Sequence, residues 1–455
     1  MKKKIFIKSY GCQMNVYDSE RMYELMAPHG YKQSDDYSEA DVIILNTCHI
    51  REKAAEKIYS ELGRIAPIKK KLAKKGINTN IVVAGCVAQA EGSEIINRQP
   101  IVDIVVGPQT YHKLPEFLSR IQKKSSRIVD TNFPIENKFD SLHHNREVAN
   151  VTSFLSIQEG CDKFCSFCVV PYTRGLEYSR PASDIINEAK ILLKKGAKEI
   201  CLLGQNVNAY SSVKNNKSWN LARLIREIAN LEGVKRLRYM TSHPIDMSDD
   251  LIRAHGEVSF LMPYLHLPIQ SGDDDILKRM NRGYNVKLYL DIINKLRIVR
   301  DDIAFSSDFI IGFPGETDKA FNNTLKLIKE VNYAQAYSFK YSRRPGTPGS
   351  IMKQQISEEI KDERLSILQQ LLNKQQIDFN SSFKGKELEV LLEKPGKKDG
   401  QLVGKSPYLQ SIYVNSKMNK IGDLLKLKII STTKNSLEGK LIKKSFEESN
   451  RNNES

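Results

Sequence analysis

The stretch Gly160–Cys161–Asp162–Lys163–Phe164–Cys165–Ser166–Phe167–Cys168 determines how the rest of the chain is interpreted, because it holds three cysteines in a Cys-x3-Cys-x2-Cys pattern. A four-iron cluster takes one thiolate per iron, so three local thiolates leave one iron open for chemistry. Structural zinc, the alternative, is closed by four Cys or His ligands, usually in two short-spaced pairs. The chain has no second Cys-x2-Cys pair and no His within this run, so the spacing favours an iron–sulfur cluster.

Length and composition narrow the class of protein. A chain of 455 residues is long enough for about two to four domains, and 40% hydrophobic residues are enough to form buried cores. The chain has 70 Lys and Arg against 54 Asp and Glu, which gives a net charge of +16. That balance favours a polyanionic partner such as RNA, although a lysine-rich composition alone produces the same excess.

The seven cysteines are unevenly spaced, which is not typical of a disulfide framework. In a reducing cytosol such cysteines are metal ligands or catalysts. No apolar run approaches membrane-spanning length, and the apolar start of the chain is broken at Lys8, too early for a signal peptide. We therefore expect a soluble, cytoplasmic protein that does not bind a membrane.

Short β-branched runs in the first 120 residues are each followed by a cysteine. The runs are residues 5–7, 42–45 and 81–84, and the cysteines are Cys12, Cys48 and Cys86. Helix-like stretches separate the runs, and a fourth run covers residues 101–106, so we expect a doubly wound parallel sheet. Because the carboxyl ends of parallel strands share one edge, these thiols should converge on a second metal site. Simple burial in the core is the alternative for each of them.

Strand-like runs recur from residue 151 onward, again with helix-like stretches between them. They are residues 154–157, 199–203, 236–240, 264–267, 305–311 and 336–341. About six strand–helix units are too few for a closed eight-stranded barrel, so we expect an open partial (β/α)6 barrel. Cys161 follows the first strand, which places the cluster at the edge where barrel sites lie.

The strand ends of this barrel supply candidate cofactor-binding residues. Gln205 follows the second strand and Asp308 belongs to the fifth, so we expect both to face the site. Phe167, between two of the cysteines, either packs on the adenine of a cofactor or belongs to the core. Cys201 lies inside the second strand and is expected to be a core residue.

The last part of the chain changes to short strands separated by turns, which predicts a small β-barrel. A helix with apolar residues at helical spacing precedes it, over residues 357–380. We expect domains at residues 1–120, 151–382 and 383–447, with a linker at 121–150 and a disordered tail at 448–455.

Several motifs resemble those of the radical S-adenosylmethionine (SAM) methylthiotransferases. The Cys-x3-Cys-x-Phe-Cys run is similar to the radical-SAM signature, and SIQEGC at 156–161 with VVPYTRG at 169–175 resembles the tRNA-modifying members. Further segments of this likeness extend over nearly the whole chain. They are SYGCQMN at 9–15, NTC at 46–48, GCVAQ at 85–89, LGQNVNAY at 203–210, LHLPIQSG at 265–272 and DFIIGFPGET at 308–317, with VGKS at 403–406 similar to the RNA-binding TRAM domain.

The resemblance implies two [4Fe-4S] clusters and SAM as cofactors. Cys161, Cys165 and Cys168 would hold the catalytic cluster that reduces SAM to a 5′-deoxyadenosyl radical, and the N-terminal cysteines would hold an auxiliary cluster that presents sulfur. The substrate would be N6-isopentenyladenosine at position 37, in the anticodon stem-loop of tRNA, methylthiolated at C2. A flavodoxin or ferredoxin would supply electrons, and the protein would act as a monomer.

Three alternatives remain open from the sequence. A methylthiotransferase for N6-threonylcarbamoyladenosine in tRNA, or for a ribosomal protein, would share both sets of cysteines. From a different class, the chain would be an iron–sulfur RNA-binding protein without turnover. Assays on N6-isopentenyladenosine and N6-threonylcarbamoyladenosine distinguish the two possible tRNA enzymes. Formation of 5′-deoxyadenosine distinguishes an enzyme from a binding protein.

Overall fold

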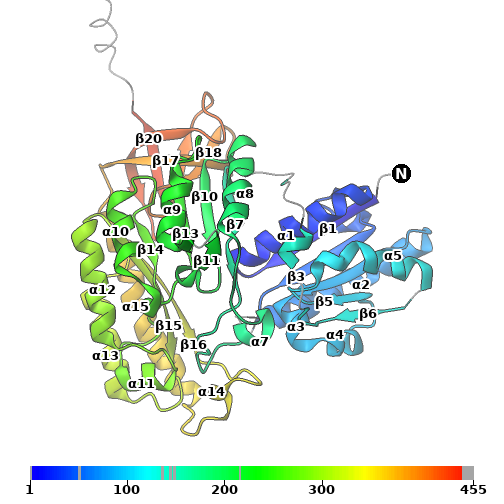
Figure 1. Ribbon diagram of the computed structural model, residues 1–455, viewed down its shortest axis with the longest axis horizontal. Coiled ribbons are helices and arrows are strands. Elements are labelled where there is room, and N and C mark those ends of the chain that lie inside the picture. Colours follow the sequence, from blue (N-terminus) through cyan, green and yellow to red (C-terminus); the bar gives the residue numbers. More distant parts are fainter. Residues whose placement is uncertain are drawn as a thin grey trace, which may run out of the picture.

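The structure is a computed structural model that describes residues 3–49, 53–124, 126–134, 138–142, 146, 150–214 and 217–442. Figure 1 shows an N-terminal sheet domain beside a central barrel, with a small C-terminal β-barrel on the end of the central one. The tail expected at 448–455 lies outside the described residues. Within the described residues, every helix is too short or too polar to cross a membrane.

The N-terminal domain is built on a parallel sheet with the strand order β2-β1-β3-β4-β5-β6. Its strands are β1 (Lys3–Tyr10), β2 (Tyr31–Gln33), β3 (Val42–Thr47), β4 (Asn80–Gly85), β5 (Ile104–Val106) and β6 (Ile128–Asp130). Helices cover both faces, which confirms the doubly wound sheet. They are α1 (Gln13–Met26) and α5 (Leu114–Lys124) on one face, and α2 (Lys53–Lys74), α3 (Cys86–Glu91) and α4 (Ser93–Arg98) on the other.

This strand order reverses between β1 and β3, and open parallel sheets bind their ligands at such a reversal. The edge strand β6 lies inside the linker expected at residues 121–150, so the described part of that segment differs from the expectation. Its helix α6 (Lys138–Ser141) and the side chain of Arg146 are also packed rather than free, because Lys138, Phe139 and Arg146 are buried. Short 3₁₀ helices occur at Ala27–His29, Tyr37–Glu39, Tyr111–Lys113, Val207–Ala209 and Pro244–Asp246.

The central domain is a partial barrel of parallel strands in sequence order. They are β7 (Thr152–Ser156), β10 (Glu199–Leu203), β13 (Arg236–Met240), β14 (Tyr264–His266), β15 (Ala304–Ile311) and β16 (Gln335–Lys340). A bridge between Leu237 and Leu261 joins the first three strands to the last three. No pairing between β7 and β16 is seen in the described chain, so the barrel is open, as expected from the sequence.

Helices enclose this barrel on its outside (Figure 1). They are α8 (Ala182–Lys194), α9 (Leu221–Ala229), α10 (Asp249–Glu257), α12 (Val286–Val299), α13 (Asp318–Val331) and α15 (Glu358–Ser381). Their apolar faces pack on the strands to form the main core of the protein. Shorter helices and strands lie within the loops that connect these elements. They are β8 (Gln158–Glu159), α7 (Val170–Arg174), β9 (Tyr178–Ser179), β11 (Ser211–Lys214), β12 (Lys217–Asn220), α11 (Asp274–Arg279) and α14 (Pro348–Ile351).

The C-terminal domain is a closed barrel with the strand order β17-β18-β19-β21-β20, as expected for a small β-barrel. Its strands are β17 (Glu387–Pro395), β18 (Gln401–Lys405), β19 (Ser411–Asn415), β20 (Leu424–Thr432) and β21 (Ser436–Leu441). Arg238 fastens it to the central domain, because its guanidinium group donates to the carbonyls of Ser406 and Pro407 at 3.0 and 2.7 Å. The same guanidinium group binds the buried Glu199 at 3.0 Å, so the attachment is rigid and charge-balanced.

Helix α1 carries part of the N-terminal domain's contact with the central domain. Arg146 is buried there and binds three carboxylates: Glu20 at 2.7 Å, Glu24 at 2.9 Å and Glu188 at 2.9 Å. Glu20 and Glu24 come from α1, whereas Glu188 comes from α8 of the barrel. Arg146 therefore joins two domains whose carboxylates would otherwise repel each other.

We expect Arg146→Met to destabilise this contact by about 3–5 kcal/mol, because the three carboxylates would then face only the two buried cations Arg21 and Arg180, which leaves one negative charge uncompensated. Burial alone would raise the pKa of Glu188, but Arg180, Arg21 and Arg146 hold it at about 2, so its carboxylate is ionised. Thermal unfolding of the apoprotein measures the effect as an earlier first transition. Arg226→Met is the matched control: its ion pairs are on the surface and worth about 0–1 kcal/mol. Equal losses in both variants would contradict the role of Arg146.

Candidate functional site

The loop that carries Cys161, Cys165 and Cys168 begins at the carboxyl end of the first barrel strand. Gly160, which opens the loop, has a φ of +72°, and a Cβ atom there would lie 1.9 Å from the carbonyl oxygen of Leu176. Only glycine fits this position without moving the backbone. The sequence therefore folds the chain sharply at the point where the first cysteine has to face the barrel edge.

Two glutamines hold this turn in place. The amide N–H of Gly160 donates to Oε1 of Gln205 at 2.7 Å, and Nε2 of Gln158 donates to the carbonyl of Gly160 at 2.7 Å. The Oε1 atom of Gln158 accepts from the backbone N–H groups of Gln205 and Asn206. The end of β10 is thus tied directly to the start of the cysteine loop.

The far side of the loop is held by the segment that follows α11. Arg282 donates from Nη1 to the sulfur of Cys165 at 3.2 Å and from Nη2 to the carbonyl of Pro268 at 2.8 Å. Asn281 donates to the carbonyls of Lys163 and Phe164 at 3.2 and 3.1 Å. Arg282 therefore places a buried cation directly against the sulfur of Cys165.

The other three cysteines gather at the strand reversal of the N-terminal sheet, as expected from their positions. Cys12 precedes α1, Cys48 follows β3, and Cys86 is the first residue of α3. Gly11 has a φ of +115°, and a Cβ atom there would lie 2.3 Å from Cβ of Cys48, so glycine permits the close approach of these two loops. The hydrogen bond with Cys48 lowers the pKa of Cys12 to about 6.

Three of the other thiols lie in surroundings that disfavour a bare thiolate. Burial raises the pKa of Cys161 to about 11 and that of Cys168 to about 12, and it also raises the pKa of Cys86. A bound metal supplies the positive charge that such buried sulfurs lack, and a coordinating thiol is deprotonated outright. The donor set of each trio therefore suits a soft metal centre.

Within the described chain, no three His, Cys, Asp or Glu side chains are arranged as ligands of one metal ion. A four-iron cluster makes a different demand, because each thiolate binds a different iron at a different corner of the cube. Three thiols can therefore bind one cluster without converging on a single point, whether they lie on separate loops or along one loop. Each trio has the number of thiols that a four-iron cluster with one open iron needs.

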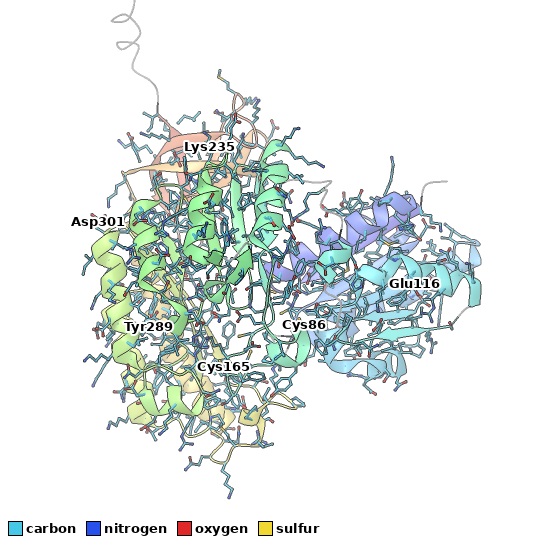
Figure 2. All side chains as sticks on the ribbon, viewed as in Figure 1. Cys86, Glu116, Cys165, Lys235, Tyr289 and Asp301 are labelled. Atoms are coloured by element: carbon cyan, nitrogen blue, oxygen red, sulfur yellow. The ribbon has the colours of Figure 1, made fainter. Side chains whose placement is uncertain are left out.

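Helix α7 connects the two trios. It begins two residues after Cys168 and packs against α3, whose first residue is Cys86 (Figure 1). In Figure 2, Cys86 and Cys165 lie on the facing sides of the two domains. The last residue of α7, Arg174, is buried between them and donates to Asp18 at 2.6 Å and to Glu159 at 2.9 Å.

Arg174 belongs to a buried cluster of charges at the domain contact. Lys138 binds Glu159 at 2.6 Å and lies 3.7 Å from Asp18, so two cations face two carboxylates. Gln109 adds hydrogen bonds to Glu159 and to the carbonyl of Arg174, at 3.2 and 2.8 Å. The sequence gives no sign of this cluster, although Arg174 lies in the VVPYTRG segment that resembles the tRNA-modifying enzymes.

The predicted cofactor-binding residues lie in three different places. Gln205 contacts the cysteine loop, as described above. Phe167 packs against an apolar group that includes Met280 and Phe313, so its ring contributes to the core near the loop. Asp308 lies on β15, in the other half of the barrel, with Oδ2 at 3.5 Å from Nε2 of His266. Their contact with SAM stays a prediction.

Several polar atoms near the carboxyl ends of the first barrel strands are buried and have no hydrogen-bond partner among the described residues. They are Oγ of Ser156, Oδ1 of Asn206, Oγ of Ser242 and Nε2 of His243. Buried polar atoms are normally paired, so several unpaired ones at one barrel edge suit a polar ligand such as SAM. The sequence shows Asn and Ser at turns but gives no signal that these atoms are left unpaired.

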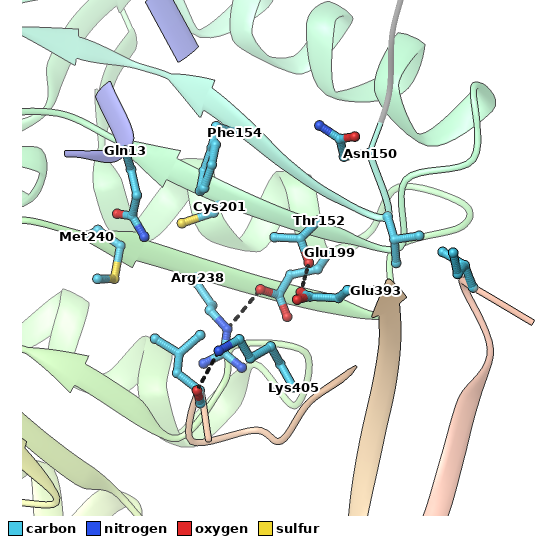
Figure 3. A pocket seen from close by; sticks show the side chains of 13 residues that line it. Gln13, Asn150, Thr152, Phe154, Glu199, Cys201, Arg238, Met240, Glu393 and Lys405 are labelled. Carbon is cyan, nitrogen blue, oxygen red and sulfur yellow. Dashed lines mark hydrogen bonds and ion pairs between the residues drawn. The ribbon is translucent and has the colours of Figure 1, made fainter. Parts of the chain in front are cut away.

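A cavity of about 570 Å³ lies between one face of β7, β10 and β13, the C-terminal barrel and the start of α1. Figure 3 shows the side chains that line it. Glu199 binds Arg238 at its wall, and Thr152 donates to Glu393 at 2.7 Å. Cys201 lines it from within β10 and is buried, as expected for a core residue. Among the described cysteines, it is the one outside both trios.

Comparisons with known proteins match every part of this architecture. The uncharacterized protein family UPF0004 matches residues 4–107, the radical SAM superfamily residues 155–328 and the TRAM domain residues 381–442. Curated proteins called tRNA-2-methylthio-N(6)-dimethylallyladenosine synthase match nearly end to end. That of Rickettsia canadensis is 54% identical and covers 97% of this chain and 100% of its own, and that of Maricaulis maris is 52% identical and covers 97% of both chains.

Solved structures show the same fold at low sequence identity. The radical SAM methyltransferase TsrM from Kitasatospora setae, with cobalamin and a [4Fe-4S] cluster bound, has a TM-score of 0.56 at 12% identity, covering 77% of this chain and 74% of its own. The cobalamin-dependent SAM radical enzyme OxsB has a TM-score of 0.53 at 11% identity, covering 82% of this chain and 56% of its own. These likenesses support the architecture of a sheet domain joined to a partial barrel.

Proposed function

The chain belongs to the family of tRNA-2-methylthio-N(6)-dimethylallyladenosine synthases, and from this premise we propose that it adds a methylthio group to C2 of N6-isopentenyladenosine at position 37 of tRNA. The observation that carries the proposal is the pairing of two cysteine trios across one domain contact, joined by α7. A reaction that both activates an inert carbon and delivers sulfur needs two such centres.

In this proposal each trio holds a [4Fe-4S] cluster and leaves one iron without a protein ligand. The cluster on Cys161, Cys165 and Cys168, when bound, supplies the electron that cleaves SAM, and that on the N-terminal trio supplies sulfur. Cofactors carry out such chemistry because no amino-acid side chain activates an aromatic C–H bond, and the protein's part is binding, orientation and electrostatics.

The chain's own residues would position SAM beside the loop. Gln205 accepts from Gly160 through Oε1, and its amide nitrogen is a donor for a carboxylate or hydroxyl of SAM. The unpaired atoms of Ser156, Asn206 and His243 would bind further polar groups of SAM at the same edge. Asp308 would face the cofactor from the opposite half of the barrel, and Phe167 would pack beside its adenine.

The C-terminal barrel supplies a surface for the phosphate backbone of tRNA. On β20, Lys426 and Lys428 are exposed while Leu427 and Ile429 between and beside them are buried, so the lysines share the outer face. Exposed lysines at 384, 386, 394, 397, 398, 417 and 420 add to it. Lysines bind phosphates by releasing counterions, so binding of the anticodon stem-loop would weaken steeply with salt.

The proposal includes a cytoplasmic monomer that receives electrons from a flavodoxin or ferredoxin. Its main test is mass spectrometry of tRNA nucleosides from a strain in which the gene is deleted. We expect isopentenyladenosine to accumulate and its 2-methylthio derivative to disappear, and the wild-type gene to restore it. Loss of a methylthio group from threonylcarbamoyladenosine or from a ribosomal protein instead would contradict the substrate. An unchanged set of methylthio products would contradict the activity.

A further inference from the structure

We infer that the buried ion pair of Arg174 and Asp18 sets the reduction potential of the cluster held by Cys12, Cys48 and Cys86, with Arg174 raising it and Asp18 lowering it. The inference rests on the proposed function, because it assumes that this trio holds a cluster. It concerns charges outside the ligand set, at the contact between α7 and α3. Both residues would act through the charge that they place beside the cluster, and neither would touch the reacting atoms.

The first support is the burial of the pair. Arg174 is 3% exposed and Asp18 is 1% exposed, so water screens neither charge. Their hydrogen bond, from Nη2 to Oδ2, is 2.6 Å long. Interactions between charges in such an environment are several times stronger than at the surface, and they reach beyond direct contact.

The second support is that both charges lie on helices that lead to the cysteines of this trio. Arg174 is the last residue of α7, and α7 packs on α3, whose first residue is Cys86. Asp18 lies on α1, which begins directly after Cys12. The pair therefore flanks the site that the trio would occupy, with one charge of each sign.

The third support is the balance of the surrounding cluster. Arg174 and Lys138 face Asp18 and Glu159, so the four side chains sum to zero charge. A neutral substitution at any one of them leaves a net charge buried beside the cysteines. The sign of that charge depends on which residue is replaced, so two substitutions in one ion pair give opposite effects.

The expected direction follows from the charge of a cluster. Reduction adds an electron, and a positive charge nearby stabilises the reduced form, which raises the potential. Net charge and hydrogen bonds to the sulfurs are known determinants of cluster potentials. Arg174 supplies a buried positive charge beside the trio, whereas Asp18 supplies a buried negative one.

The test uses the full chain with Cys161, Cys165 and Cys168 all replaced by alanine, so that only the N-terminal trio binds a cluster. After anaerobic reconstitution, iron content and an electron paramagnetic resonance potentiometric titration are measured. We expect Arg174→Gln to shift the midpoint to more negative potential and Asp18→Asn to shift it to less negative potential. Arg174→Lys keeps the charge and should shift it less than Arg174→Gln does.

Arg364→Gln is the matched control. Arg364 is also buried in an ion pair, with Glu316 at 2.8 Å, but it lies on α15 in the central barrel. Its replacement should leave the potential unchanged while disturbing the fold in a comparable way. If the Arg174 pair has a purely structural role, the midpoint potentials of Arg174→Gln and Asp18→Asn should shift in the same direction or stay unchanged. That result would overturn the inference.

The outcomes also separate this inference from the proposed function. If the parent triple variant binds far fewer than about four irons, the N-terminal trio holds no cluster and both proposals fail. If it binds the cluster and the potentials do not move, the inference alone fails. Should Arg174→Gln lose the cluster through misfolding, Asp18→Asn still decides, because asparagine keeps the shape of the side chain while removing its charge.

Discussion

Cys165→Ala is expected to abolish SAM cleavage and to lower the bound iron from about eight to about four atoms per chain. Cys165 is the buried member of its trio, and Arg282 contacts its sulfur directly. Without it, the loop offers two thiols at 161 and 168, which are too few to hold a four-iron cluster against solvent. The readout is 5′-deoxyadenosine released by the reduced, reconstituted protein, with iron measured on the same sample.

The chain supplies a matched control for this substitution in Cys201. It too is buried, but it lies within β10 and outside both trios. Cys201→Ala should keep about eight irons and full 5′-deoxyadenosine formation, because it removes only a small side chain from a cavity wall. SAM cleavage by Cys165→Ala at the rate of Cys201→Ala would show that the cysteine loop is not the catalytic ligand set.

The long buried strands were predictable from sequence and the short edge strands were not. The β-branched runs that became β3 and β4 are buried throughout, so their apolar pattern is unbroken. By contrast β2 reads Tyr-Lys-Gln, β6 is only three residues long, and β18 and β21 of the C-terminal barrel mix apolar and polar residues. Such strands are defined by their neighbours in the sheet rather than by their own sequence.

The cysteines of the site were predictable because metal ligands keep a spacing or a place at strand ends. The residues that hold them were not. Gln158 binds the backbone of Gln205, Arg282 binds Cys165 and Lys138 binds Glu159, each across a long stretch of sequence. A polar residue gives no sign of its partner before the chain folds. Gln205 shows the intermediate case, since its position at a strand end was informative but its bond to Gly160 was not.

Cys86→Ala is expected to separate the two halves of the reaction: methylthio transfer to tRNA should be lost while SAM cleavage persists. Cys86 begins α3, and alanine is a good helix former, so the local fold should survive the change. The loop of Cys161 is fastened to the barrel by Gln158, Gln205 and Arg282, and none of these bonds involves Cys86. The catalytic trio should therefore still bind its cluster.

Three measurements on one preparation decide this prediction. Iron should fall to about four atoms per chain, 5′-deoxyadenosine should still form, and no 2-methylthio nucleoside should appear in tRNA. If Cys86→Ala still makes the product, the N-terminal trio does not supply sulfur. If it also stops SAM cleavage while Cys201→Ala does not, the two centres depend on each other through α7, because that helix packs on the α3 turn that Cys86 begins.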